Sequence, residues 1–372
     1  MKTEVSNGEI TLIQQPDIII TRKSYTMLVA AIAVLFAISL AGCGHPGEQA
    51  EMPIAPADLA NPLMGTDSEY LLSHGNTYPA VALPFGMNFW TPQTRRNGDG
   101  WAYTYDDHKI TGIKQTHQPS PWINDYAAFS LMPVTGGYRI TEEQRASWFS
   151  HKAEVARPYY YSVYLADYDI TAEVTPTERS ALFRFTFPES DSSVVVIDAF
   201  AGGSMVKIIP AERKVIGYCR NNHGGVPENF HNYFVIIFDR DFSFSCATLD
   251  GKPLPGSTEQ SGDHAAAVIG FRTERGEQVT ARVASSFISH EQALLNLERE
   301  TGDRDFDMVR DAAKERWNSE LGRIRVEGGT EDQVRTFYST LYRTLICPRT
   351  FHEYESEEKI VYYSPYNGQE PP

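Results

Sequence analysis

The chain of 372 residues is poor in cysteine and lacks several motifs, and each absence excludes a kind of protein. It contains no G-x-S-x-G, G-x-x-x-x-G-K-[ST] or H-E-x-x-H motif, which excludes the common nucleophile elbow, phosphate-binding loop and zinc-binding helix. Of its four cysteines, the three after Cys43 are Cys219, Cys246 and Cys347, an odd number without metal-ligand spacing. We therefore expect buried free thiols and no disulfide framework.

Basic residues are also scarce. The chain has 33 Lys and Arg against 48 Asp and Glu, which gives a formal net charge of −15. Nucleic-acid binding depends on a basic surface, so we exclude nucleic acid as a partner. An acidic surface can host cations, but by itself it indicates only a soluble protein.

The apolar run "MLVAAIAVLFAISL", residues 27–40, is too short to span a bilayer comfortably. Arg22 and Lys23 precede it and small residues follow it, which is the order of a secretory signal. "LAGC", ending at Cys43, resembles the lipobox of bacterial lipoproteins. The resemblance implies a signal peptide over 1–43 and a lipid on Cys43 that anchors the secreted protein to the bacterial cell envelope. We expect the outer membrane, on its periplasmic or its outer face; a plain membrane anchor is the simpler alternative.

The next segments predict a tether and then a β-sandwich. Residues 44–58 are rich in Pro, Ala and Gly, as in a flexible spacer. From about 155 to 287, short β-branched and aromatic runs alternate with Gly, Asn, Asp and Pro at intervals of about ten residues. This spacing is typical of an antiparallel sandwich, and we assign the domain to residues 59–288.

Helical periodicity replaces the strand pattern after residue 288. Ser289 and Gln292 have capping-box spacing, and so do Thr330 and Gln333. Two apolar helix faces are predicted: Phe306, Val309, Ala313, Trp317 and Leu321; then Val334, Phe337, Leu341 and Leu345, with Pro348 as the stop. We expect a helical linker over 289–328. The face after residue 329 needs a partner, so we expect the chain to stop inside a second, helical domain over 329–372.

Residues 61–136 concentrate Trp, His, Asp and Asn beside Gly and Pro. "HGNTYPAVALPFGMNFWTP", residues 74–92, has neither the period of a helix nor the sustained alternation of a strand. We therefore predict rigid irregular loops of the kind that build binding sites. Sugars suit such a surface, because aromatic rings cover the apolar face of a pyranose while amides and carboxylates bind its hydroxyls.

Four segments in order resemble the N-terminal signatures of family 92 glycoside hydrolases, the exo-acting α-mannosidases frequent in Bacteroidetes. They are "NPLMGTD", "HGNTYPAVALPFGM", "YDDHKITGIKQTHQPSPW" and "FYSTLYRTLICPRTF". The resemblance implies an α+β multidomain fold with an N-terminal antiparallel β-sandwich, a helical linker and a C-terminal (α/α)6 barrel. It also implies calcium-dependent, inverting hydrolysis of terminal α-mannosidic linkages in glycans.

The resemblance also implies candidate sugar-binding residues. Trp90 and Trp101 match tryptophans that line the sugar site, the alternative being core aromatics. His74, Gly75 and Asn76 match the loop that the sandwich contributes to the pocket. Gly75 would let backbone approach the sugar, and His74 could equally be a surface histidine.

Two further segments carry candidates. His117 lies in a matching motif, but the family pattern continues with Ser-Gly whereas this chain has Gln-Pro-Ser-Pro, a departure in the local loop. In "CPRTFHEYE" the family places a carboxylate that touches the terminal sugar, and Glu353 or Glu355 is the candidate.

The family's acid Glu, its base Asp and most of its calcium ligands lie in the barrel. We therefore expect the catalytic pair beyond residue 372 and an inactive fragment when this chain stands alone. Asp99, Asp106 and Asp107 lack the spacing of a calcium-binding loop, and a turn explains them more simply. Two alternatives remain: a non-catalytic surface glycan-binding lipoprotein, and an inert fragment of a split gene.

Overall fold

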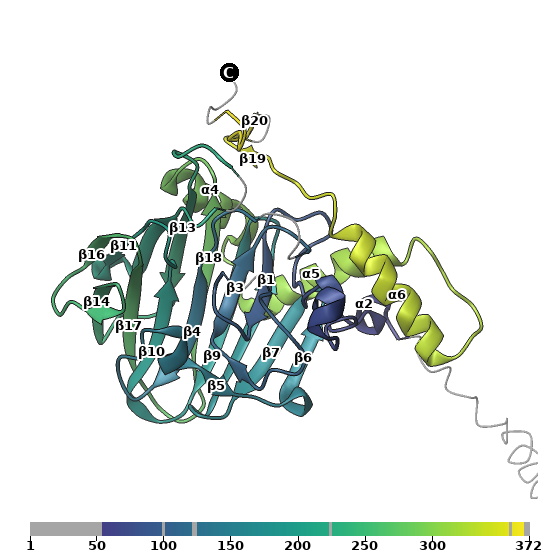
Figure 1. Ribbon diagram of the computed structural model, residues 1–372, viewed down its shortest axis with the longest axis horizontal. Coiled ribbons are helices and arrows are strands. Elements are labelled where there is room, and N and C mark those ends of the chain that lie inside the picture. Colours follow the sequence, from purple (N-terminus) through teal and green to yellow (C-terminus); the bar gives the residue numbers. More distant parts are fainter. Residues whose placement is uncertain (1–53, 99–100, 121–124, 223–224, 357–358, 368–372) are drawn as a thin grey trace, which may run out of the picture. The chain divides into compact units, whose positions relative to one another are not determined.

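The computed structural model describes residues 54–98, 101–120, 125–222, 225–356 and 359–367. Two large antiparallel sheets dominate this part of the chain (Figure 1). One has seven strands in the order β1-β3-β4-β10-β17-β14-β15, and the other has nine in the order β16-β11-β12-β13-β18-β9-β8-β7-β6.

The seven-stranded sheet contains β1 Phe89–Gln93, β3 Gly112–Thr116, β4 Ser130–Thr135, β10 Ser190–Asp198, β17 Ala265–Thr273, β14 Phe244–Leu249 and β15 Lys252–Pro253. The nine-stranded sheet contains β16 Glu259–Gly262, β11 Ser204–Ile209, β12 Lys214–Cys219, β13 Asn232–Phe238, β18 Glu277–Ser286, β9 Ser180–Phe187, β8 Ile170–Pro176, β7 Tyr160–Leu165 and β6 Glu154–Arg157. Two small hairpins pair β2 Lys109–Ile110 with β5 Ser147–Trp148, and β19 Glu353–Tyr354 with β20 Ile360–Val361.

The main hydrophobic core lies between the two sheets, as a sandwich requires. Phe129, beside β4, stacks on Phe234 of β13 with ring centroids 4.4 Å apart. Strand β7 shows the alternation expected of a strand with one buried face: Tyr161, Val163 and Leu165 are buried, and the residues between them are not. The predicted antiparallel β-sandwich is therefore confirmed.

The sandwich begins earlier in the chain than the strand pattern indicated. Strands β1, β3 and β4 lie within residues 61–136, which we predicted to be irregular loops, and that prediction is wrong for these strands. All five residues of β1 are buried, so no polar–apolar alternation marks it. Pro92 in β1 and Pro133 in β4 also argued against strands, because proline is uncommon inside a strand.

The helices are α2 Pro56–Leu59, α3 Glu142–Arg145, α4 His290–Thr301, α5 Phe306–Leu321 and α6 Glu331–Leu345. The 3-10 turns are η1 Tyr70–Asn76, η2 His151–Ala153 and η3 Pro210–Glu212. Ser289 and Thr330 are the predicted N-caps, and their hydroxyls accept hydrogen bonds from the backbone N–H groups of Gln292 and Gln333. All five residues of the predicted apolar face of α5 are buried.

The predicted apolar face of α6 packs against the cluster around Trp317, although its four residues are not the most deeply buried of the helix. Tyr338 and Tyr342 are buried, whereas Val334, Phe337, Leu341 and Leu345 are only half-buried in the described part of the chain. Tyrosines were not counted as apolar in the periodic pattern, and Tyr338 and Tyr342, next to the predicted face, are the more deeply buried residues.

The cysteine prediction is partly wrong. Cys219 and Cys246 are buried free thiols, but Cys347 is exposed just after α6. Among the described residues, no helix is long and apolar enough to cross a bilayer. The signal segment, Cys43 and most of the tether lie outside the described residues, so these assignments and the domain boundaries stay predictions.

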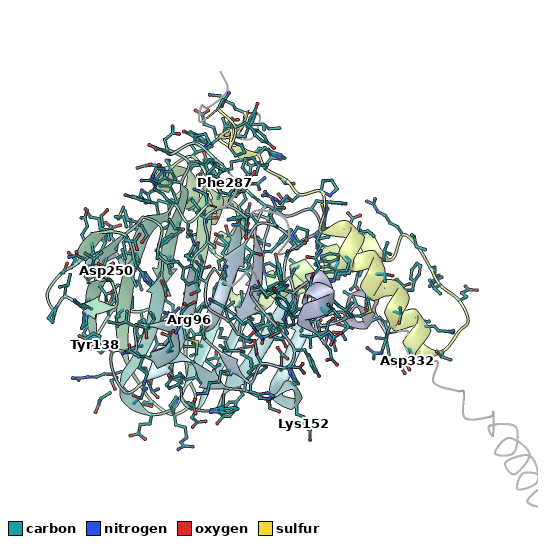
Figure 2. The ribbon with its side chains drawn as sticks, viewed as in Figure 1. Arg96, Tyr138, Lys152, Asp250, Phe287 and Asp332 are labelled. Carbon is teal, nitrogen blue, oxygen red and sulfur yellow. The ribbon has the colours of Figure 1, made fainter. Side chains whose placement is uncertain are left out.

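A smaller cluster around Phe287, labelled in Figure 2, joins the end of β18 to the segment after α6. Phe287 stacks on Phe230 at 5.0 Å and on Phe351 at 4.9 Å between ring centroids. The residues that follow α6 are therefore packed onto the sandwich.

The segment from Tyr78 to Phe85 forms a seam between the sandwich and the helices. Tyr342 and Trp317 donate hydrogen bonds to the carbonyls of Ala80 and Ala82, at 2.5 and 2.7 Å. The Phe85 N–H donates to the carbonyl of Leu345, at the end of α6. Side chains of the helices thus donate to backbone carbonyls of this segment, whereas within the sheets a neighbouring strand provides the donors.

We predict that Tyr342→Phe lowers the free energy of unfolding by about 1–3 kcal/mol, because the buried Ala80 carbonyl loses its side-chain donor while the ring stays in place. Urea unfolding of the chain measures this effect. The matched control is Tyr164→Phe, whose exposed hydroxyl donates to Asp169 and whose loss should change stability little. Equal effects of the two substitutions would contradict the importance of the seam.

Candidate functional site

His74, Gly75 and Asn76 lie on turn η1, whose backbone is unusual. Ser73, His74, Gly75 and Asn76 have φ values of 55°, 45°, 72° and 49°, in the left-handed region that favours glycine. A Cβ added at Gly75 would lie 1.7 Å from the carbonyl oxygen of Gly65. Gly75 is therefore required for close backbone packing against Gly65, whatever else approaches it.

The structure brings Trp101 to this turn. Its ring centroid lies 5.2 Å from that of His74 and 5.7 Å from that of Tyr70, and its indole N–H donates to the Ser73 carbonyl at 2.8 Å. His74 contacts the Ser68 carbonyl through Nδ1 at 3.1 Å. We call Tyr70, His74 and Trp101 the η1 cluster.

Sequence reasoning missed Tyr70, which is 74% exposed. Leu71 and Leu72 follow it and are 83% and 65% exposed. The sequence did contain a signal for this site, because Tyr70, Leu71 and Leu72 are three consecutive large apolar residues within a polar segment. Such side chains seldom all face solvent without a binding partner.

The loop that departs from the family pattern lies beside the same turn. The Ser120 hydroxyl donates to Asn76 Oδ1 at 2.7 Å. Tyr78 bonds the Thr116 hydroxyl at 2.7 Å and the Gln118 carbonyl. The described part of this loop is thus tied to η1, while residues 121–124 lie outside the described residues.

Arg343 of α6 positions the approach to η1. Its guanidinium donates to the carbonyls of Tyr78, Pro62 and Met64, at 2.9, 2.6 and 3.2 Å. Because charge-assisted bonds of this kind are strong, one side chain fixes both ends of the loop that carries Tyr70 and His74. The sequence offered no signal that singled out this arginine.

Trp90 is a core residue, and the prediction that its ring lines the sugar site is wrong. It belongs to β1 and is fully buried, with ring centroids 5.8 Å from Phe129 and 5.0 Å from Phe183. Its side chain points between the two sheets, so neither face of the indole is available to a ligand.

His117 is also a core residue, which overturns its assignment as a sugar ligand. It is fully buried, and its ring nitrogens lie 3.3 Å from the Met87 carbonyl and 3.2 Å from the Ala127 carbonyl. Burial lowers the pKa of His117 to about 3, with the positive charge of Arg349 adding to the effect. The imidazole is therefore neutral and carries one N–H, so it donates to one of these two carbonyls, while Asn232 Nδ2 lies 3.4 Å from Nε2.

Glu353 is buried as well, so the expectation that it touches a sugar is wrong for this residue. Its carboxylate accepts hydrogen bonds from the Phe287 N–H at 3.0 Å and from Asn296 Nδ2 at 2.7 Å. Burial raises the pKa of Glu353. Glu355 is exposed and ion-paired with Lys359, and its role in sugar binding stays a prediction.

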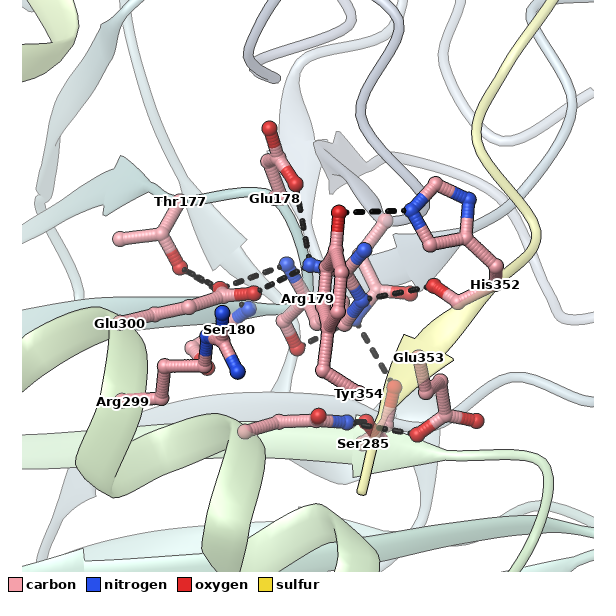
Figure 3. A network of polar contacts seen from close by, with 12 residues as sticks. Thr177, Glu178, Arg179, Ser180, Ser285, Arg299, Glu300, His352, Glu353 and Tyr354 are labelled. Carbon is pink, nitrogen blue, oxygen red and sulfur yellow. Dashed lines mark hydrogen bonds and ion pairs between the residues drawn. The ribbon is translucent and has the colours of Figure 1, made fainter. Parts of the chain in front are cut away.

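Arg179 is the centre of the network in Figure 3. Its guanidinium donates to Glu178 and Glu300, at 2.9 and 2.8 Å, and to the His352 carbonyl at 2.9 Å. It also lies 5.1 Å from the ring centroid of Tyr354. The network ties the β8–β9 turn, α4 and β19 together, and a cleft of about 370 Å³ opens beside it.

The described residues show no cluster of side chains that would by itself hold a calcium ion. Among them, no group of three or more His, Cys, Asp or Glu side chains is placed to hold a metal. Asp107 instead pairs with Arg95 at 2.9 Å, which agrees with its interpretation as part of a turn, while Asp99 lies outside the described residues.

Comparison with known proteins identifies the family. Residues 59–286 match the glycosyl hydrolase family 92 N-terminal domain, and residues 292–371 match the glycosyl hydrolase family 92 catalytic domain. The chain belongs to glycoside hydrolase family 92. This confirms the resemblance and, with the sandwich and the first helices in place, the predicted fold class.

Two solved family 92 structures show the extent of the likeness. The family GH92 inverting mannosidase from Bacteroides thetaiotaomicron VPI-5482 is 48% identical, with a TM-score of 0.83 over 86% of this chain and 43% of that one. A family GH92 α-mannosidase from Bacteroides thetaiotaomicron, in complex with mannoimidazole, is 29% identical, with a TM-score of 0.75 over 85% of this chain and 43% of that one.

A curated relative is described as an uncharacterized secreted glycosidase from Arthroderma benhamiae. It is 24% identical over 317 residues, which cover 74% of this chain and 40% of the relative. The family 92 chain thus spans less than half the length of the relatives that it matches.

We predict that His117 makes the folded family 92 chain less stable as the pH falls from 6.5 towards 3. The unfolded imidazole, with a pKa of about 6.5, takes up a proton that the folded one, with a pKa of about 3, does not. In His117→Gln, the loss of unfolding free energy between pH 7.5 and pH 5 should be smaller by about 2 kcal/mol.

Urea unfolding at the two pH values measures this difference. Asp125 acts in the opposite direction, because burial raises its pKa to about 6 and the folded state then gains stability as the pH falls below that value. Its contribution is common to both proteins and cancels in the comparison. An unchanged pH dependence in His117→Gln would show that His117 is not the buried neutral group described here.

Proposed function

We propose that the protein to which this chain belongs hydrolyses terminal α-mannosidic linkages in glycans, with inversion and with calcium. The observation that carries the proposal is the 48% identity to an inverting family GH92 mannosidase over 86% of this chain, with a TM-score of 0.83. The mannoimidazole complex of a second family 92 α-mannosidase supports a mannose-like ligand.

The chain's own contribution on this proposal is to bind and orient sugar. Trp101 would place its ring against the apolar face of a mannose, and His74 and Asn76 would bond its hydroxyls. Gly75 backbone and Glu355 complete the set of proposed contacts. Arg343 and the seam act indirectly, because they hold the loop that carries His74, Gly75 and Asn76.

The general acid Glu, the base Asp and most calcium ligands are proposed to come from the part of the family that this chain does not cover. Inverting hydrolysis needs two carboxyl groups about 6.5–9.5 Å apart, one to protonate the leaving oxygen and one to activate water. Calcium would supply charge that binds sugar hydroxyls, but no cluster of His, Cys, Asp or Glu among the described residues is placed to hold it, so we derive no step through the ion.

A non-catalytic glycan-binding lipoprotein is the alternative, and an inert fragment of a split gene is a third reading. The same sandwich and aromatic loops would serve a protein that binds glycans without cleaving them. The DNA immediately downstream distinguishes them, since an open frame that encodes the rest of a barrel with its Glu and Asp supports the enzyme.

We predict that the complete protein releases mannose from α-mannosides, loses this activity on chelation and recovers it with calcium, whereas residues 44–372 alone show no turnover. Activity that survives thorough chelation would contradict the calcium requirement. Turnover by the purified fragment would show that its catalytic groups are not missing.

Trp101 and Trp90 provide a matched pair in the complete protein. Trp101→Ala should impair mannose release without unfolding the protein, because the ring is partly exposed. Trp90→Ala should lower the unfolding free energy by about 3–5 kcal/mol, because it empties a core site.

We also propose that the protein is a lipoprotein of the bacterial cell envelope, anchored through Cys43. Cells fed labelled palmitate should incorporate label into the protein, and Cys43→Ala should abolish the label and release the protein from the membrane fraction. Membrane association that survives the substitution would favour a plain anchor.

A further inference from the structure

Trp148 is an exposed tryptophan on a rigid backbone. Its residue surface is 50% exposed, although tryptophan is usually largely buried. Its carbonyl accepts from the Ala166 N–H at 2.9 Å, its own N–H donates to Asp167 Oδ2 at 3.1 Å, and β5 pairs it with Lys109 of β2. The indole is therefore displayed from a fixed position.

Two neighbouring side chains flank the ring. Lys109 Nζ lies 5.2 Å from the ring centroid, within the range of a cation–π contact. The His108 ring is nearly parallel to the indole, with an interplanar angle of 16° and centroids 6.0 Å apart. A flat apolar surface thus lies beside groups that can bond hydroxyls.

Lys109 also lines a cleft of about 560 Å³ that shares no residue with the η1 cluster. Three cations and three carboxylates line this cleft: Arg95, Arg96, Lys109, Asp107, Glu142 and Glu143. Figure 2 labels Arg96.

Two of the carboxylates are held in place. Arg95 pairs with Asp107 at 2.9 Å, and Glu142 accepts from Gln93 at 2.5 Å and from the Asn97 N–H at 3.0 Å. The cleft is therefore built from ordered polar groups whose formal charges cancel.

We propose that Trp148 and this cleft form a second carbohydrate-binding site, which takes a segment of a neutral α-mannan chain. The indole would cover the apolar face of one pyranose, and the paired charged groups would bond the hydroxyls of its neighbours. Balanced charge favours a neutral ligand over a phosphorylated or carboxylated one, and the choice of mannose rests on the function proposed above.

The test is titration of the chain with soluble α-mannan by isothermal calorimetry. Every variant carries Trp101→Ala, which removes the contribution of the η1 cluster. In that background, Trp148→Ala should weaken binding at least tenfold, and Trp148→Phe, which keeps a smaller ring, should weaken it less. Tyr138→Ala is the matched control, because Tyr138 is 47% exposed, does not line the cleft and packs on Phe244 with ring centroids 6.0 Å apart, so its loss should leave binding unchanged.

Equal binding by the Trp148→Ala and Tyr138→Ala proteins overturns the proposal. The proposal is also overturned if the protein that carries Trp101→Ala alone does not bind mannan. Should Trp148→Ala fail to fold, as thermal unfolding would reveal, Lys109→Ala serves in its place and should also weaken binding. Hydrolysis of a small aryl α-mannoside by the complete protein separates the two proposals: its absence contradicts the enzymatic function, whereas unchanged mannan binding by Trp148→Ala contradicts only the second site.

Discussion

The buried carbonyls between Tyr78 and Phe85 are the constraint on which the rest of the structure depends. A buried carbonyl without a donor is costly, and in this segment Trp317, Tyr342 and Arg343 of two helices supply donors. The same segment leads directly into β1 at the edge of the seven-stranded sheet. Sandwich and helices are therefore joined by hydrogen bonds that neither could make alone.

The position of the η1 cluster depends on this seam. Arg343 binds the carbonyls of Pro62 and Met64 as well as that of Tyr78, so both ends of the loop are held by one guanidinium. Close contact between Gly65 and Gly75 then sets the path of the turn. A helix assigned to the catalytic domain of the family thus positions a sandwich loop proposed to bind sugar.

Features encoded by neighbouring residues could be predicted, whereas those that depend on distant ones could not. The caps at Ser289 and Thr330 and the buried face of α5 follow from spacings of three or four residues. Strand β1 was missed because all of its residues are buried, so the sequence shows no alternation of polar and apolar residues there. His117 and Glu353 resembled site residues by type, but burial among distant segments makes them structural.

The sequence by itself determined the family, the order of sheet and helices and the helix caps, because these depend on local patterns and ordered motifs. Only the tertiary structure decided the roles of the two tryptophans in and beside "HGNTYPAVALPFGMNFWTP". Trp90 meets Phe129 and Phe183 between the sheets, while Trp101 meets Tyr70 and His74 at a partly open turn. The physical reason is that the burial of an indole depends on residues distant in the sequence, which pack around Trp90 on all sides and leave Trp101 partly exposed.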